Sequence, residues 1–118
     1  MITEDYVSYE IAKLLKDKGF DESCLMCYTS DKKLGNYGHY KSCKNSDVFA
    51  LTAPTIQKAM KWLRKVHNID ISVTPDRKNG YSVLIFKDKR LPFDTLDSYS
   101  TYEQVCEVAI KYCLQNLI

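Results

Sequence analysis

The stretch that most constrains the fold runs from Thr52 to Ile69, TAPTIQKAMKWLRKVHNI, because it has the pattern of one amphipathic helix. Thr52 is placed to cap the first turn, and Pro54 fits a first-turn position where its missing N–H costs nothing. Asn68 is expected to end the helix in a left-handed conformation. Apolar residues at helical spacing predict its buried stripe: Ile56, Ala59, Met60, Leu63 and Val66.

One further helix is predicted near each end of the chain. Thr3 is a suitable cap for a helix over residues 4–18, and Gly19 supplies its stop. Ser100 and a glutamate three residues later form a capping box, which predicts a helix over 101–117. Its broad apolar face includes Cys106 and Cys113, and both cysteines are expected to be core residues.

Two hairpins and their flanking loops account for the rest of the chain. The alternating patterns and turn residues predict strands over 24–29, 36–41, 69–73 and 81–87, with turns at 30–35 and 75–80. Residues 48–51 look strand-like, and 91–100 are expected to be a loop. The predicted class is α+β, in the order α-β-β-α-β-β-α, with an antiparallel sheet and three helices packed mostly on one face. A chain of 118 residues fits a single small domain over 1–118.

Composition points to an ordinary globular protein. No run approaches the roughly 18 apolar residues that a membrane helix needs, and the acidic N-terminus lacks the features of a signal peptide. We therefore expect a cytoplasmic protein with no membrane partner. Its five cysteines are expected to be reduced there, and their odd number agrees with this.

The net charge of +2 conceals an uneven distribution. Residues 32–90 hold 13 lysines and arginines against 4 aspartates, a balance of +9, and the remainder has a balance of −7. A basic middle between acidic flanks is typical of a protein with an anionic partner. The alternative is that the two parts neutralise each other in the fold.

The outer face of the central helix is the main functional candidate, with nucleic acid as the predicted partner. Its lysines could meet phosphates, and Trp62 could offer a stacking surface. The alternative is that Trp62 covers the edge of the core while the lysines form a solvated face. The predicted contacts are Lys58, Lys61, Trp62 and Lys65, helped by Lys32, Lys33, Arg77 and Lys78.

A metal site is a weaker hypothesis. Cys24, Cys27, His39 and Cys43 have the spacing C-x2-C-x11-H-x3-C, which resembles a zinc finger. Against it, residues 24–28 have the pattern of a strand, which would point the first two cysteines to opposite faces. The competing interpretation is that these cysteines are small core and loop residues, and no cofactor is expected.

Catalytic motifs are missing from the sequence. It has no glycine-rich phosphate loop, no nucleophile elbow and no paired-carboxylate motif, so we expect a binding domain rather than an enzyme. A second class of function is a protein–protein adaptor. Such an adaptor would present an apolar patch around Tyr99, Tyr102 and Tyr112.

Three segments carry a resemblance to a known family. EIAKLLKDKGFDE, TAPTIQKAMKWLRKVHNI and STYEQVCEVAIKYCLQNLI resemble small proteins found in gut-bacterial genomes and in their phages or mobile elements. The portion APT-x-x-x-AMKWLR is the most specific. The resemblance implies a bacterial or phage protein of the cytoplasm and carries over no activity and no site residue. It does not extend to residues 35–47, where the cysteine–histidine spacing lies.

Overall fold

The computed structural model describes residues 2–36, 42–47, 50–76, 80–90 and 94–118, with the backbone alone for 94–98. Three helices and five strands follow one another as α1, β1, β2, α2, β3, β4, β5 and α3. All strand pairs are antiparallel, so the predicted α+β class is confirmed. The chain divides into two compact units, residues 1–55 and 56–118, and each is described by itself.

In the first unit, α1 spans Tyr9–Asp17 and is shorter than the predicted helix over 4–18. Ser8 caps it by accepting a hydrogen bond from the backbone N–H of Ile11. The predicted cap at Thr3 is wrong, because the residues before Ser8 pair with another segment. Val7 donates its backbone N–H to the carbonyl of Pro54 at 3.0 Å, and Tyr6 forms a bridge with Thr55.

The end of α1 follows the prediction. Gly19 adopts a φ of 92°, in the left-handed region that glycine enters without a steric penalty. Its N–H bonds to the carbonyl of Lys16, and the N–H of Phe20 bonds to that of Leu15, which is the Schellman pattern. Phe20 and Leu15 are both fully buried, so the turn directs an aromatic ring into the core of this unit.

The first hairpin joins β1, Met26–Tyr28, to β2, Leu34–Asn36, with Cys27 opposite Gly35. The predicted return strand over 36–41 begins two residues too late, and residues 37–41 lie outside the described part of the chain. The turn is tighter than predicted. The side-chain hydroxyl of Thr29 accepts a hydrogen bond from the backbone N–H of Lys33, and the Thr29 carbonyl accepts one from the backbone N–H of Lys32. Lys32 has a φ of 62°.

The segment before α2 pairs with the first hairpin. Thr52 forms a bridge with Cys27, and Ala53 donates its backbone N–H to the carbonyl of Met26. Buried Asn45 clamps this segment, because its amide donates to Phe20 O at 2.7 Å and its side-chain oxygen accepts from Thr52 N at 2.9 Å. Of the strand-like piece 48–51, the first two residues lie outside the described ranges.

In the second unit, α2 spans Ile56–His67. The predicted start with Thr52 as cap is wrong, because residues 52–53 are engaged in the pairing with β1 and cannot be helical. The predicted end is confirmed, since Asn68 has a φ of 55°. Ile56, Ala59, Met60 and Leu63 are buried as predicted, whereas Val66 in the last turn is 58% exposed.

A three-stranded sheet follows in the order β3-β4-β5, formed by Ile69–Pro75, Tyr81–Lys87 and Asp94–Tyr99. The hairpin β3–β4 is the predicted one, with Ile71 opposite Ile85. The third strand corrects the prediction of a loop over 91–100. Its polar sequence hides the alternation expected of a strand, but its backbone pairs with β4, so that β4 is central rather than an edge.

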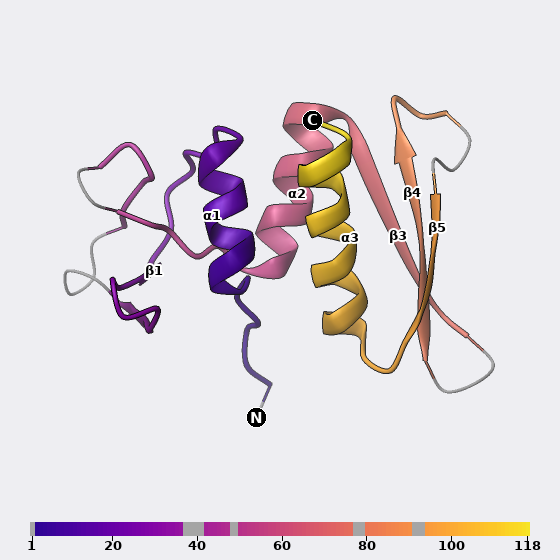
Figure 1. Ribbon diagram of the computed structural model, residues 1–118, viewed down its shortest axis with the longest axis horizontal. Coiled ribbons are helices and arrows are strands. Elements are labelled where there is room, and N and C mark those ends of the chain that lie inside the picture. Colours follow the sequence, from indigo (N-terminus) through magenta and orange to yellow (C-terminus); the bar gives the residue numbers. More distant parts are fainter. Residues whose placement is uncertain (1, 37–41, 48–49, 77–79, 91–93) are drawn as a thin grey trace. The chain divides into compact units, whose positions relative to one another are not determined.

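The last helix, α3, spans Tyr102–Asn116 and is capped by Thr101, one residue after the predicted cap. Figure 1 shows α2 and α3 side by side on one face of the sheet, as their contacts with the strands also indicate. Cys106 and Cys113 are fully buried, so their prediction as core residues is confirmed. The core of this unit also contains Ile69, Val83, Ile85, Val105, Ala109, Ile110 and Leu114.

Candidate functional site

A row of basic residues runs along the outer side of α2. Lys61, Arg64 and Lys65 are exposed, and Lys58 one turn earlier is half-buried. We call these four residues the basic face. Three of them were predicted from the sequence, and Arg64 was missed, although its spacing of three residues from Lys61 places it on the same side of a helix.

The exposed members of the basic face have no neutralising partner among the described residues. Lys89 forms an ion pair with Asp70 at 3.3 Å, but none of the described carboxylates pairs with Lys61, Arg64 or Lys65. These three residues lie within little more than one turn of helix, so their charges add to one local positive potential. Such a surface attracts anions, and the phosphate backbone of a nucleic acid is one of them.

Trp62 does not belong to this surface, which corrects its predicted place on the outer face. Its side chain is 7% exposed and contacts His67 edge to face, with 4.7 Å between the ring centroids. The alternative interpretation of the sequence, in which Trp62 covers the edge of the core, is the one that the structure shows. The ring is therefore not presented for stacking on a base.

His67 is held neutral beside this tryptophan. Burial lowers the pKa of its imidazole below 6.5, and the nearby ammonium of Lys87 lowers that pKa further. Its Nε2 is buried without a hydrogen-bond partner among the described residues. The helix therefore ends in a neutral ring rather than in an additional positive charge.

The remaining predicted nucleic-acid contacts are not residues of α2. Lys32 and Lys33 are exposed in the turn of the first hairpin, which belongs to the other unit. The ammonium of Lys32 lies 5.2 Å from the centroid of the Tyr9 ring. Arg77 and Lys78 lie outside the described residues.

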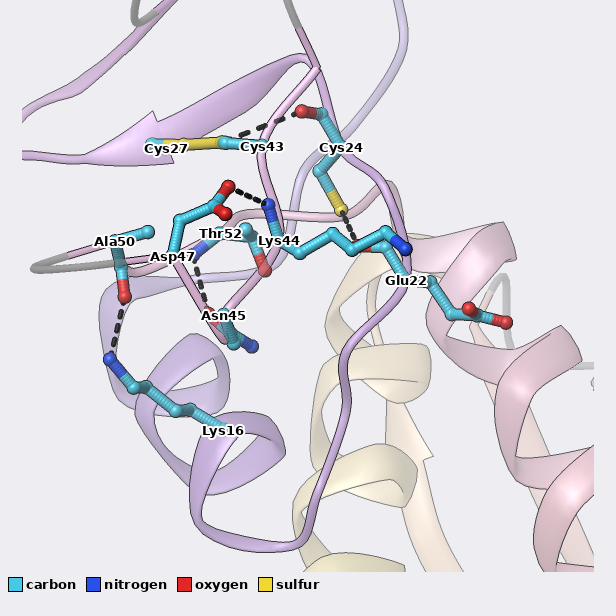
Figure 2. Close-up of a disulfide and its surroundings, with 10 residues drawn as sticks. All are labelled: Lys16, Glu22, Cys24, Cys27, Cys43, Lys44, Asn45, Asp47, Ala50 and Thr52. Carbon is cyan, nitrogen blue, oxygen red and sulfur yellow. Dashed lines mark hydrogen bonds between the residues drawn. A yellow bond between two sulfur atoms is a disulfide. The ribbon is translucent and has the colours of Figure 1, made fainter.

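The cysteines of the first unit form a cluster. Cys24 and Cys43 face each other through two backbone hydrogen bonds of 2.8 Å, and Cys43 is joined to Cys27 by a disulfide. Figure 2 shows the Cys24 sulfur turned away from that disulfide, toward the carbonyl of Glu22. The prediction that all five cysteines are reduced is therefore wrong for Cys27 and Cys43.

This arrangement bears on the predicted zinc ligands. Two of the four, Cys27 and Cys43, are bonded to each other and are not available as thiolates. His39 lies outside the described part of the chain. Among the described residues, no three histidine, cysteine or acidic side chains converge as a metal site would require.

The tyrosines of the predicted adaptor patch are only partly exposed. Tyr99, Tyr102 and Tyr112 are each half-buried. Tyr102 contacts the ring of Tyr81 edge to face at 5.8 Å, and its hydroxyl accepts a hydrogen bond from the Gln57 amide at 3.2 Å. The Tyr102 ring therefore contributes to packing within the second unit.

The first unit also contains a groove beside α1 with a volume of about 350 Å³. Its wall includes Tyr9, Lys13 and Lys16 of the helix, Tyr28 of β1, and the two hydroxyl residues that follow Tyr28. Sequence reasoning did not identify this groove, because its residues are separated by up to 42 positions and carry no common motif.

No helix among the described residues is sufficiently long and apolar to cross a membrane. Comparison of the chain with known protein families, with curated proteins and with solved structures found no match.

Proposed function

We propose that this protein is a non-enzymatic domain that binds nucleic acid through the basic face of α2. The observation that supports the proposal is the exposure of Lys61, Arg64 and Lys65 on one side of a helix, without carboxylate partners among the described residues. A bacterial or phage origin in a mobile element belongs to the same proposal and rests on the resemblance of the three helical segments.

The expected mode of binding is electrostatic. Because Trp62 is buried, the α2 surface offers ammonium and guanidinium groups but no aromatic ring for base stacking. Phosphate contacts carry no sequence information by themselves, so binding should be largely independent of sequence. Three such contacts predict that the logarithm of the binding constant falls with the logarithm of salt concentration, with a slope of about −2 to −3.

Fluorescence anisotropy with labelled single- and double-stranded DNA at several salt concentrations tests the proposal. The reversal Lys65→Glu should weaken binding to every DNA sequence and lower the magnitude of the salt slope by at least about 1. A matched control is Lys44→Glu, which makes the same charge change at an exposed residue of the other unit. That variant should bind DNA like the unaltered protein.

Two results would contradict the proposal. The first is equal loss of affinity in the two variants, because the effect would then follow net charge and not the basic face. The second is unchanged binding by the triple variant K61E/R64E/K65E, which would place the contact on another surface. Thermal melts of each variant must match that of the unaltered protein before the binding data are compared.

A cytoplasmic location is also part of this proposal, since chromosomal and phage nucleic acids are found there. The disulfide provides its test, because protein disulfides are rare in the cytosol. Protein trapped with a thiol-blocking reagent during cell lysis should carry Cys27 and Cys43 as blocked thiols if it resides in the cytoplasm. Isolation with the disulfide intact would argue for an oxidising compartment.

A further inference from the structure

We propose that the groove beside α1 is a binding site for a mononucleotide, a ligand that combines phosphate with a planar base. This site lies wholly within the first unit and is independent of the basic face. Its volume of about 350 Å³ falls within the range of about 300–1,000 Å³ that small-molecule sites occupy.

The walls of the groove are held in place by long-range hydrogen bonds. Tyr28 donates its hydroxyl to the Val7 carbonyl at 2.6 Å, and its backbone N–H bonds to the Leu51 carbonyl at 2.8 Å. Lys16 extends from α1 to donate to the Ala50 carbonyl at 2.6 Å, a contact that is drawn in Figure 2. The helix, β1 and residues 50–51 are thereby joined into one preformed wall.

Positive charge gathers at the helical side. The ammonium of Lys13 lies 5.8 Å from the centroid of the Tyr9 ring, and that of Lys32 lies 5.2 Å from it. A cation over an aromatic face keeps its charge and its outward N–H donors. Lys16, which donates to the Ala50 carbonyl, lines the groove together with Lys13, so two lysines can meet one anionic group there, which favours phosphate over a neutral ligand.

Tyr9 and Tyr28 form an aromatic wall of the groove beside these lysines. Tyr9 and Tyr28 contact each other edge to face, with ring centroids 5.5 Å apart, and neither ring is fully buried. Leu51 adds apolar surface to the same wall. A planar base can pack against such a surface, whereas inorganic phosphate gains nothing from it.

Polar groups at the rim suit the sugar. Thr29 and Ser30 line the groove, and the carboxylate of Asp17 lines it one helical turn beyond Lys13. A carboxylate accepts hydrogen bonds from ribose hydroxyls, and it repels an anion placed at its own end of the groove. Phosphate is therefore expected near Lys13, with the ribose toward Asp17.

Titration calorimetry with AMP, ADP, adenosine and inorganic phosphate tests this site, together with backbone NMR shifts. AMP and ADP should bind, with adenosine and phosphate each weaker by about tenfold or more, because each lacks one of the two complementary parts. Lys13→Glu should weaken ADP binding by about tenfold or more. The control Lys44→Glu, in the same unit but outside the groove, should not.

The results that would overturn the proposal are distinct. Failure of both nucleotides to bind at about 1 mM would exclude a nucleotide site of useful affinity. Equal affinity for ADP and phosphate would remove the role of the aromatic wall, and ADP binding unaffected by Lys13→Glu would place the ligand elsewhere. The variant Lys65→Glu should bind ADP normally even if it loses DNA binding. The proposal for the groove and the proposal for the basic face can therefore fail independently of each other.

Discussion

His67, the last residue of α2, should make the stability of the folded protein depend on pH. Burial and the charge of Lys87 lower its pKa in the folded protein below 6.5. The unfolded state therefore takes up a proton at a higher pH than the folded state does. The contribution of neutral His67 to the free energy of unfolding is therefore complete above pH 6.5. It is lost as the pH falls from 6.5 through the pKa of the folded state.

Two measurements test this expectation for His67. An NMR titration of its ring should give a midpoint below 6.5, and thermal stability should decline between pH 7 and pH 5. In His67→Asn, part of that decline should disappear, because the substituted residue does not titrate. A midpoint at or above 6.5 would show that the ring is solvated and that its contact with Trp62 does not desolvate it.

The two cysteines of α3 should be chemically inert in the folded protein. Burial raises the pKa of Cys106 to about 11 and that of Cys113 to about 12, so neither forms thiolate at neutral pH. At pH 8, a thiol reagent should leave both unmodified for as long as the protein stays folded, and should label both in denaturant. Mass spectrometry of peptides resolves the sites, and rapid native labelling of either one would contradict the burial.

At the scale of elements, the disulfide between Cys27 and Cys43 should stabilise the first unit. It closes a loop over a sequence separation of 16, for which chain entropy predicts about 3 kcal/mol. The double variant Cys27→Ala and Cys43→Ala should lower the free energy of unfolding by that order, as measured by denaturant titration. In purified, air-oxidised protein, thiol counting in denaturant should find three thiols before reduction, from Cys24, Cys106 and Cys113, and five thiols after it. Five thiols before reduction in that oxidised sample would contradict the disulfide.

Elements whose signal is local were predictable, and elements fixed by distant partners were not. Three predictions that depend on side chains close in sequence are confirmed: the buried stripe from Ile56 to Leu63, the end of α2 at Asn68, and the hairpin of β3 and β4. The starts of α1 and α2 were misplaced, because residues 6–7 pair with residues 54–55 and residues 52–53 pair with β1. Hydrogen bonds to such remote segments override an N-cap pattern.

The candidate site shows the same division. Lys58, Lys61 and Lys65 follow from helical spacing, but Trp62 on the same helix is buried and contacts the His67 ring. The sequence placed Trp62 next to Lys61 and Lys58, at the border between the polar and apolar sides, where spacing alone does not decide exposure. The disulfide and the groove arise from segments brought together by folding, so spacing could not reveal them.

For the whole molecule, the open question is whether the units 1–55 and 56–118 unfold together. A length of 118 residues predicts a single domain, and no linker residues separate the two units in the sequence. Trp62 is the chain's one tryptophan and lies in the second unit, whereas the disulfide lies in the first. Reduction therefore perturbs one unit while fluorescence reports on the other.

If the chain is one cooperative domain, reduction with a phosphine should shift the Trp62 fluorescence transition by the same amount as the far-ultraviolet circular dichroism transition. A stabilisation of about 3 kcal/mol is large enough to move a thermal midpoint by several degrees in a domain of this size. A circular dichroism transition that splits, with the Trp62 transition unmoved, would instead show two units that fold separately. In that case the nucleic-acid face and the nucleotide groove would belong to independently folding parts, and each could be expressed and tested alone.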